Sequence, residues 1–580
     1  MTTHHEVGAA PIGYPEAAAS DKGLKGGALG LLSSVVVGMA STAPAYSLAA
    51  SLGLVVASGG SILAGVKAPA IMLLAFVPMY FIAVAYAELN KAEPDCGTTF
   101  TWAARSFGSW MGWMGGWGII AADVIVMANL AQVAGKYSFT FAGELGWTSA
   151  ASLADSTLWS TVAGVVWIAV MTYICYRGIE VSARLQYALL GIEVVVLIVF
   201  AVTALVKVYS GHAESYSLHP SLSWFWPGGL SFGTVIAPAV LVAAFIYWGW
   251  DTAVTTNEEA DDPATTPGRA AVISTLLLLV TYALVSVAAV AFAGVGTDGI
   301  GLGNKDNASD VFAAIGPDLF GHSFLGTAGL ILLSLSVLTS ASASTQTTIL
   351  PTARTALSMG AYKALPAAFT RIHPRFLTPT VATVVMGVVS AAFYVLFTLI
   401  SPNLLLALIG SVGLMIAFYY GLTGFACAWF YRRTLTKSLR HFVMRGVLPL
   451  AGGVMLFAAF AYALKSYAAP DWLTDANDKN VTIFGFGAVA VVGVLAMVLG
   501  VVLMLVWRVL APDYFTPGEP LGRRGHHDLI LAGIATEEET VRLPDAGMPD
   551  IVIAPDLSNL PEGAVAVDIE TGEEIRRPRG

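Results

Sequence analysis

Three carboxylates stand inside long apolar stretches of this sequence, at Asp123, Glu193 and Asp251. A charge at the centre of a bilayer costs roughly 2.5–3.5 kcal/mol on insertion scales, so we expect these acids to face the interior of a helix bundle. Burial favours the protonated form of a carboxylate, which makes each acid a candidate proton carrier or partner for a cation. The alternative is a neutral acid that is hydrogen-bonded to a neighbouring backbone group.

Two apolar stretches contain helix-breaking residues near their centres. The first has Gly38 and Pro44 on either side of small and hydroxyl residues, and the second has Gly249 among large aromatic residues. Lipid cannot satisfy free peptide groups, so an irregular backbone at mid-membrane implies a cavity. An unwound helix frees N–H groups on one half and C=O groups on the other, and a zwitterion matches that pair. The alternative is a plain kink in a packed helix, since Gly and Pro are common in membrane spans.

The composition indicates a membrane protein rather than a soluble one. The 580 residues are 56% hydrophobic and 12% charged, whereas soluble domains are about 45–50% apolar and about 25% charged. This excludes a soluble enzyme, a nucleic-acid binder and a disordered scaffold. The sequence contains no nucleophile–base arrangement and no phosphate loop, and its three cysteines are scattered. We therefore expect no enzyme activity, no cofactor, no metal site and no nucleic-acid partner.

Twelve stretches are long and apolar enough to cross a bilayer as helices. With twelve spans, 23 of the 29 Lys and Arg residues fall on the side of the two chain ends and 6 on the other side. The positive-inside rule then predicts a multi-pass protein of the cell membrane with both termini in the cytoplasm. The spans lie near residues 29–57, 62–87, 109–143, 157–177, 184–209, 232–258, 270–296, 323–359, 378–400, 403–431, 446–468 and 482–510.

The sequence divides into three regions. Residues 1–27 form a polar N-terminal tail, residues 28–511 a transmembrane domain, and residues 512–580 an acidic C-terminal tail. The C-terminal tail holds 14 Asp and Glu residues against 6 Lys and Arg residues. We expect both tails to be cytoplasmic, and an unstructured, solvated C-terminal tail is the simplest expectation.

Four segments, in chain order, resemble the amino acid–polyamine–organocation (APC) superfamily of secondary transporters. The resemblance implies an all-α membrane fold of the LeuT type, with a five-plus-five inverted repeat and two extra helices. It also implies a substrate held between the first and sixth spans, with Phe245 as a gating aromatic residue. The segments are Gly38-Met39-Ala40-Ser41-Thr42, Tyr86-Ala87-Glu88-Leu89 followed by Pro94-Asp95-Cys96-Gly97-Thr98-Thr99-Phe100, Asp251-Thr252-Ala253 through Asn257-Glu258-Glu259 to Pro263, and Arg354-Thr355-Ala356-Leu357-Ser358-Met359-Gly360 followed by Leu365-Pro366 and Thr378-Pro379.

Two positions depart from the family pattern. Ala40 stands at the second glycine of the family's Gly-x-Gly motif. Glu193 stands where a similar family segment has a lysine, which in proton-coupled relatives takes the place of a bound sodium ion. Glutamate has the opposite charge, so it is a candidate either to carry the coupled proton or to partner a cationic substrate.

These observations predict a permease that takes up an amino acid or a related amine or polyamine by proton symport. The backbone around Gly38–Ser41 would contact a carboxylate, and carbonyls around Phe245–Trp248 would contact an ammonium group. Glu193 is the first candidate for coupling and Asp123 the second. The predicted substrate-binding residues are Gly38, Met39, Ala40, Ser41, Thr42, Phe245, Ile246, Tyr247, Trp248 and Asp251.

Other functions of the same fold stay open at this point. One is transport of an inorganic cation such as potassium, with the deep carboxylates and hydroxyls as ligands. Another is a substrate sensor that uses the acidic tail to contact a cytoplasmic partner. Three deep acids and no deep base favour a neutral or cationic solute over an anionic one. The sequence predicts neither the oligomeric state nor the choice between symport and exchange.

Overall fold

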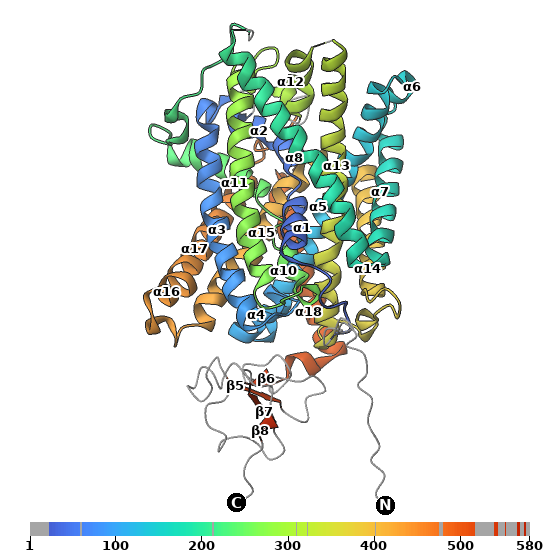
Figure 1. The fold of residues 1–580 in the computed structure, drawn as a ribbon, viewed down its shortest axis with the longest axis vertical. Helices are drawn as coiled ribbons and strands as arrows, with labels where there is room; N and C mark the ends of the chain where they lie inside the picture. Colours follow the sequence, from blue (N-terminus) through green and yellow to red (C-terminus); the bar gives the residue numbers. More distant parts are fainter. Residues whose placement is uncertain are drawn as a thin grey trace, which may run out of the picture.

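The structure is a computed structural model in which long helices stand side by side in an upright bundle (Figure 1). Short helices close its two ends, with α6 and α12 at the upper end and α4 at the lower end (Figure 1). The structure describes residues 22–58, 61–211, 214–308, 310–321, 323–400, 402–474, 479–516, 539–542, 551–552, 565–568 and 574–575.

Eleven segments of the described residues are long and apolar enough to cross a membrane. The one remaining predicted span, the sixth in chain order, is interrupted and contains α9 (Ala237–Ile246) and α10 (Thr252–Thr255). A π-helical turn, η3 (Phe232–Ile236), precedes α9. The helices of the eleven segments are α1 (Leu31–Ser41) with α2 (Pro44–Val56), α3 (Ala68–Ala92), α5 (Ser109–Glu144), α7 (Thr157–Arg177), α8 (Ile179–Tyr209), α11 (Thr266–Ala293), α13 (Phe324–Ala361), α14 (Thr380–Ile400), α15 (Pro402–Phe430), α17 (Leu448–Tyr467) and α18 (Ala488–Leu510).

Short elements connect the spans. The four-stranded antiparallel sheet, in the order β6-β5-β7-β8, lies within the predicted C-terminal tail. The short helices are α4 (Thr99–Phe107), α6 (Thr148–Ala151), α12 (Val311–Phe320) and α16 (Leu439–His441), with the turns η1 (Gly65–Lys67), η2 (Leu222–Phe225), η4 (Asn257–Glu259), η5 (Lys305–Asn307), η6 (Ala367–Thr370), η7 (Leu435–Lys437), η8 (Phe442–Val447) and η9 (Pro512–Phe515). The strands are β1 (Ala57–Ser58), β2 (Ser61–Ile62), β3 (Thr482–Ile483), β4 (Phe486–Gly487), β5 (Glu539–Arg542), β6 (Ile551–Val552), β7 (Val565–Asp568) and β8 (Glu574–Ile575).

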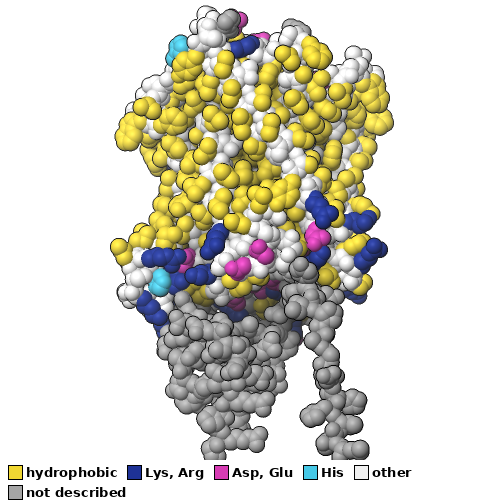
Figure 2. Space-filling model, in the orientation of Figure 1, with side chains coloured by type: hydrophobic (Ala, Val, Ile, Leu, Met, Phe, Trp, Pro, Cys, Tyr) yellow, Lys and Arg dark blue, Asp and Glu magenta, His cyan; other side chains and the backbone are white. Residues whose placement is uncertain are grey.

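Burial separates central spans from peripheral ones. The most apolar window of the α1–α2 span is 83% buried, whereas the corresponding window of α7 is 28% buried. Apolar side chains cover the sides of the bundle, and most of the visible Lys and Arg residues gather near its lower end (Figure 2). This pattern is that of a protein whose sides face lipid, because a charged side chain is costly there and an apolar one is not.

The first break separates α1 from α2. Pro44 begins α2 and has no N–H to donate to α1, which favours a break at this place, and Ala43 before it takes a left-handed conformation with φ 47°. The sequence predicted a break that extends from Gly38 to Pro44. In the structure α1 ends at Ser41 and α2 begins at Pro44, so the non-helical residues are Thr42 and Ala43. Gly38 instead lies inside α1 and packs closely, since a Cβ atom there would be 2.9 Å from Ser274 Oγ.

The second break follows α9, as the sequence predicts. Helix α9 ends at Ile246, and α10 begins at Thr252. Between them Gly249 has φ +116°, a conformation that side-chain-bearing residues rarely adopt. The sixth span is therefore two half-helices joined by an irregular segment.

A Gly249→Ala substitution tests this geometry. A Cβ atom at Gly249 would be 2.7 Å from the Ser41 carbonyl oxygen, so we expect the free energy of unfolding to fall by about 2 kcal/mol or more. Thermal unfolding of the purified protein measures the change. Gly191→Ala is the control: Gly191 lies inside α8 with open space where a Cβ atom would stand, so alanine there is expected to stabilise by up to about 1 kcal/mol. Equal stability of the two variants would contradict the described break.

Candidate functional site

The two breaks meet each other inside the bundle. The hydroxyls of Ser41 and Thr252 are 2.8 Å apart and share a hydrogen bond, which joins the end of α1 to the start of α10. Ser344 of α13 donates a hydrogen bond to the Ser41 carbonyl at 2.9 Å. The missing side chain of Gly249 allows its backbone to approach the same carbonyl. Both interrupted spans and α13 are therefore fastened together at one point.

Glu193 of α8 lies at the N-terminus of α2. Its Oε1 accepts hydrogen bonds from the Ala45 N–H at 2.6 Å and from the Ser340 hydroxyl at 2.7 Å. The Tyr46 N–H donates to the same Ser340 oxygen at 3.1 Å. Glu193 is fully buried, and its Oε2 has no hydrogen-bond partner. The acid predicted for coupling therefore supplies an acceptor for one of the N–H groups that the start of α2 leaves free.

Asp251 is held by two neighbouring tyrosines of α15. Tyr420 donates its hydroxyl hydrogen to Oδ1 at 2.9 Å, and Tyr419 donates to Oδ2 at 3.0 Å. The Trp248 indole N–H donates to the Tyr419 hydroxyl. The ring of Trp250 lies 5.1 Å from the ring of Tyr420, measured between centroids. This acid of the second break is therefore enclosed by aromatic side chains and hydroxyl donors.

The other predicted substrate-binding residues lie at the ends of α1 and α9, and the second coupling candidate, Asp123, lies on α5. Thr42 and Ile246 are joined through Tyr282 of α11, whose hydroxyl donates to the Ile246 carbonyl at 2.7 Å and lies 3.3 Å from the Thr42 hydroxyl. Phe245 and Tyr247 flank Ile246 where α9 ends, and Met39 and Ala40 lie in the last turn of α1, all of them buried. Asp123 accepts a hydrogen bond from Thr352, which links α5 to α13, and it interacts electrostatically with Asp251 of the second break.

Sequence reasoning missed several residues that complete this site. Tyr282, Tyr419 and Tyr420 are fully or almost fully buried and direct hydroxyls at the breaks. The signal in the sequence was the presence of these hydroxyls inside apolar spans. Nothing in the sequence paired them with Asp251 or with the Ile246 carbonyl, because the pairing depends on how the helices pack.

Two grooves on the outer surface of the described bundle do not match this site. One is lined by Gly191, Val195, Phe320 and neighbouring apolar residues, and the other by Phe107, Trp429 and further apolar residues. Grooves with apolar walls on the sides of the bundle suit lipid chains. They offer no polar group that would orient a polar solute.

A second cluster of charges lies at the lower end of the bundle. The Lys22 ammonium stands between Asp95 and Glu258, at 2.8 Å and 2.5 Å from their carboxylate oxygens, and all three side chains are buried. Arg354 of α13 forms two hydrogen bonds of 2.8 Å with Glu259. These pairs tie the start of the described chain to the α3–α4 loop, the segment after α10 and α13. These pairs were not predictable from the sequence, since positions 22, 95 and 258 are far apart in the chain.

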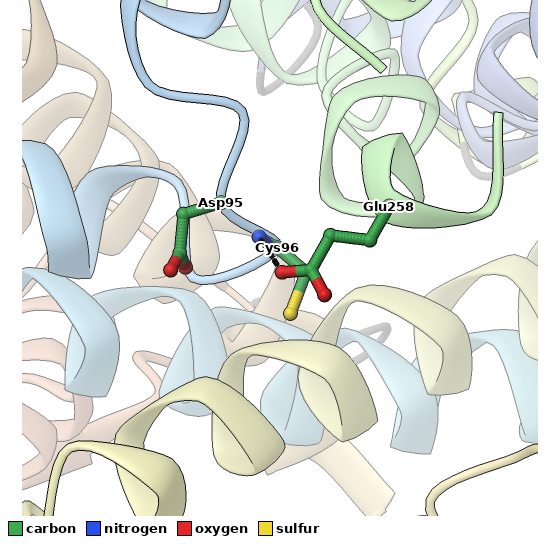
Figure 3. Close-up of side chains that lie close together, drawn as sticks. All are labelled: Asp95, Cys96 and Glu258. Carbon is green, nitrogen blue, oxygen red and sulfur yellow. Dashed lines mark hydrogen bonds between the residues drawn. The ribbon is translucent and has the colours of Figure 1, made fainter. Parts of the chain in front are cut away.

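Asp95, Cys96 and Glu258 lie close enough together to be considered as metal ligands (Figure 3). One candidate ligand atom from each residue lies within 4.8 Å of the others. The Lys22 ammonium, however, contacts both carboxylates and supplies the positive charge that a cation would bring. Burial also raises the pKa of the Cys96 thiol, which keeps it protonated and a poor ligand. The group is an ion-pair cluster rather than a metal centre.

The charges of Asp95 and Lys22 are stable over a wide range of pH. Burial alone would raise the pKa of Asp95, but the Lys22 ammonium and hydrogen bonds from Ser358 and Gly97 outweigh it and lower the pKa to about 2. Burial alone would lower the pKa of Lys22, but the two carboxylates outweigh it and raise the pKa. The Asp95 contribution to stability is therefore present above about pH 4 and lost as the pH falls towards 2. The Lys22 contribution is lost only in strong alkali, so neither group responds to pH near 7.

The sequence matches the family model described as "Amino acid permease" over residues 29–470. A similar relative is the uncharacterized transporter Rv1999c of Mycobacterium tuberculosis, 28% identical over 447 residues, which are 76% of this chain and 87% of the relative. The branched-chain amino acid permease BcaP of Bacillus subtilis is 25% identical over 57% of this chain and 68% of its own length. The arginine/ornithine antiporter of Latilactobacillus sakei is 24% identical over 73% of this chain and 86% of its own length.

A solved structure shares the fold. The crystal structure of MhsT in complex with L-phenylalanine aligns with a TM-score of 0.51, 14% sequence identity and coverage of 74% of this chain and 98% of MhsT. This likeness, together with the helical bundle and its interrupted first and sixth spans, confirms the predicted LeuT-type fold.

A Lys22→Met substitution tests the lower-end cluster. Removing one partner of a buried ion pair costs about 3–5 kcal/mol, because the remaining charges stay buried and unpaired. We expect the lower end to loosen, so that maleimide labels Cys96, which is fully buried, at least about tenfold faster. Mass spectrometry of the labelled protein measures the rate.

Lys25→Met is the matched control for this substitution. Lys25 pairs with Glu180, and the two side chains are 37% and 44% exposed. Exposed pairs of this kind contribute about 0–1 kcal/mol, so Cys96 labelling should stay at the wild-type rate. If Lys22→Met labelled no faster than Lys25→Met, the cluster would not hold the lower end closed.

Proposed function

Because the chain belongs to the amino acid permease family and is therefore a membrane transporter rather than an enzyme, we propose that it takes up an amino acid or a related amine. In this proposal uptake is coupled to protons and proceeds by alternating access. The relatives named above are a branched-chain amino acid permease and an arginine/ornithine antiporter, which supports a small nitrogen-containing solute.

The contact between the two breaks is the observation that carries this proposal. Helix ends inside a membrane need partners for their free peptide groups, and here Ser41, Thr252 and Gly249 bring two such ends together. In our proposal the solute binds between residues 38–42 and residues 245–248, beside Asp251. Each half-helix can then tilt about its break, which opens the site to one side of the membrane at a time.

Glu193 is our first candidate for proton coupling. Neutralisation by a proton removes the cost of burying a lone carboxylate, and it also weakens the attraction between Glu193 and the N-terminus of α2. Glu193 of α8 accepts hydrogen bonds from Ala45 of α2 and Ser340 of α13. Gain or loss of a proton would therefore bias the position of α2 relative to α8 and α13. Asp123 is the second candidate, because it links α5 to α13 through Thr352.

The distribution of charges supports the proposed orientation. Most of the Lys and Arg residues seen in Figure 2 gather near the lower end of the bundle, where the described chain begins at Lys22 and where α18 leads into η9. By the positive-inside rule we place this end, and both termini, in the cytoplasm of the cell.

Uptake into proteoliposomes tests the function. We expect an imposed inward proton gradient to drive accumulation of a radiolabelled amino acid or amine. Collapse of the gradient with a protonophore should remove the accumulation. A potassium gradient that drives uptake of potassium itself, with no organic solute accumulated, would instead identify an inorganic cation transporter.

Substitution of the coupling acids separates coupling from binding. We expect Glu193→Gln to lose about tenfold or more of the gradient-driven uptake, because glutamine keeps an acceptor for Ala45 but takes up no proton at neutral pH. Exchange of solute between two equal pools should continue. Asp123→Asn is the parallel variant for the second candidate. Unchanged gradient-driven uptake by Glu193→Gln would remove Glu193 as the proton carrier.

A further inference from the structure

We propose that the solute is an organic cation that is recognised through its ammonium group and needs no carboxylate. This inference rests on the proposed function, since it assumes that the solute binds where the two breaks meet. It narrows the class of solute from amino acids and amines to amines. Three observations support it: the occupied amides of the first break, the position of Glu193 and the surroundings of Asp251.

The peptide N–H groups at the first break already have acceptors. Pro44 has none to offer, and the other residues from Thr42 to Ser47 all donate to atoms of this chain. The bonds run from Thr42 to the Met39 carbonyl at 3.1 Å, from Ala43 to the Ala40 carbonyl at 3.2 Å, from Ala45 to Glu193 at 2.6 Å, from Tyr46 to Ser340 at 3.1 Å and from Ser47 to the Ala43 carbonyl at 2.8 Å. The residues of the predicted carboxylate site, Gly38 to Ser41, lie inside α1. A solute carboxylate would therefore have to displace an existing hydrogen bond.

Glu193 supplies a carboxylate of the protein's own at the N-terminus of α2. Its Oε1 accepts the Ala45 N–H, while its buried Oε2 has no partner. A second carboxylate brought to this place would have to displace Glu193 from the Ala45 N–H. The protein thus fills with its own side chain the N-terminus of α2, where a solute carboxylate could otherwise bind.

Asp251 has the surroundings expected of a cation site. Hydroxyl donors from Tyr419 and Tyr420 stabilise its negative charge, and none of the salt bridges among the described residues involves it. The rings of Trp248, Trp250 and Tyr420 belong to the same contact network. Aromatic faces attract ammonium groups, and a buried carboxylate without a partner gains from one. An amine brings the positive charge that this part of the bundle lacks.

Matched pairs of an amine and its parent amino acid test the inference on the wild-type protein. The probes are putrescine with ornithine, cadaverine with lysine, and phenethylamine with phenylalanine. Binding is measured by thermal shift with the purified full-length chain and by competition for uptake into proteoliposomes. We expect the amine to bind at least as tightly as its parent in at least one pair.

The possible outcomes separate this inference from the proposed function. If the parent amino acid binds more tightly than its amine in every pair, the inference is overturned and the proposed function stands. If neither series binds or is taken up, the proposed function itself fails. If an amine binds at least as tightly as its parent, both are supported.

Asp251→Asn identifies the group that recognises the amine. Asparagine keeps the shape of the side chain but carries no charge, so we expect amine affinity to fall at least about tenfold. Tyr420→Phe, which removes one donor and keeps the ring, should weaken amine binding less and keeps the test usable if Asp251→Asn does not fold. Asp155→Asn, at an exposed acid after α6, is the control and should bind like the wild type. Unchanged amine binding by a folded Asp251→Asn variant would overturn the assignment of Asp251.

Discussion

The contact between Gly249 and the Ser41 carbonyl is the constraint on which the rest of the site depends. A half-helix that ends inside a membrane carries free peptide groups, and lipid offers them no partner. This chain gives the N–H groups of the first break acceptors on α1, Glu193 and Ser340. It also places the two ends against each other, with a glycine where a side chain would separate them. Hydroxyl groups from α10 and α13 then satisfy the Ser41 oxygen atoms. This contact involves few residues, but it fixes the position of the first span relative to the sixth.

Charges are used differently at the lower end and at the breaks. At the lower end each buried acid of the cluster has a cationic partner: Asp95 and Glu258 pair with Lys22, and Glu259 pairs with Arg354. At the breaks Glu193 and Asp251 have hydrogen-bond donors and no cation among the described residues. The buried Lys22–Asp95 pair holds parts of the chain together over a wide range of pH. Acids without a cation are available to a proton or to a positively charged solute, which is why we assign transport to the breaks and closure to the cluster.

Much of the fold was predictable because membrane solvation leaves strong patterns in a sequence. Long apolar stretches predicted the spans, and Gly249 and Pro44 predicted where two of them are interrupted. The placement of Gly38 within the first break was less accurate, because a glycine inside a helix can serve close packing instead, as it does against Ser274. The partners of Asp251 and the contacts of Lys22 were not predictable, since they join positions 73 to 236 residues apart through the packing of the chain. The assignment of individual residues to solute binding stays a prediction.

A cryo-electron-microscopy structure of the protein with a saturating transported solute tests the central claim most directly. Our account predicts density for the solute between the end of α1 and the segment from Tyr247 to Asp251, in contact with at least one of the two breaks. Density for the solute elsewhere, such as the apolar groove beside Gly191 and Phe320, with Ser41 and Gly249 still in contact and no solute beside them, would contradict the account.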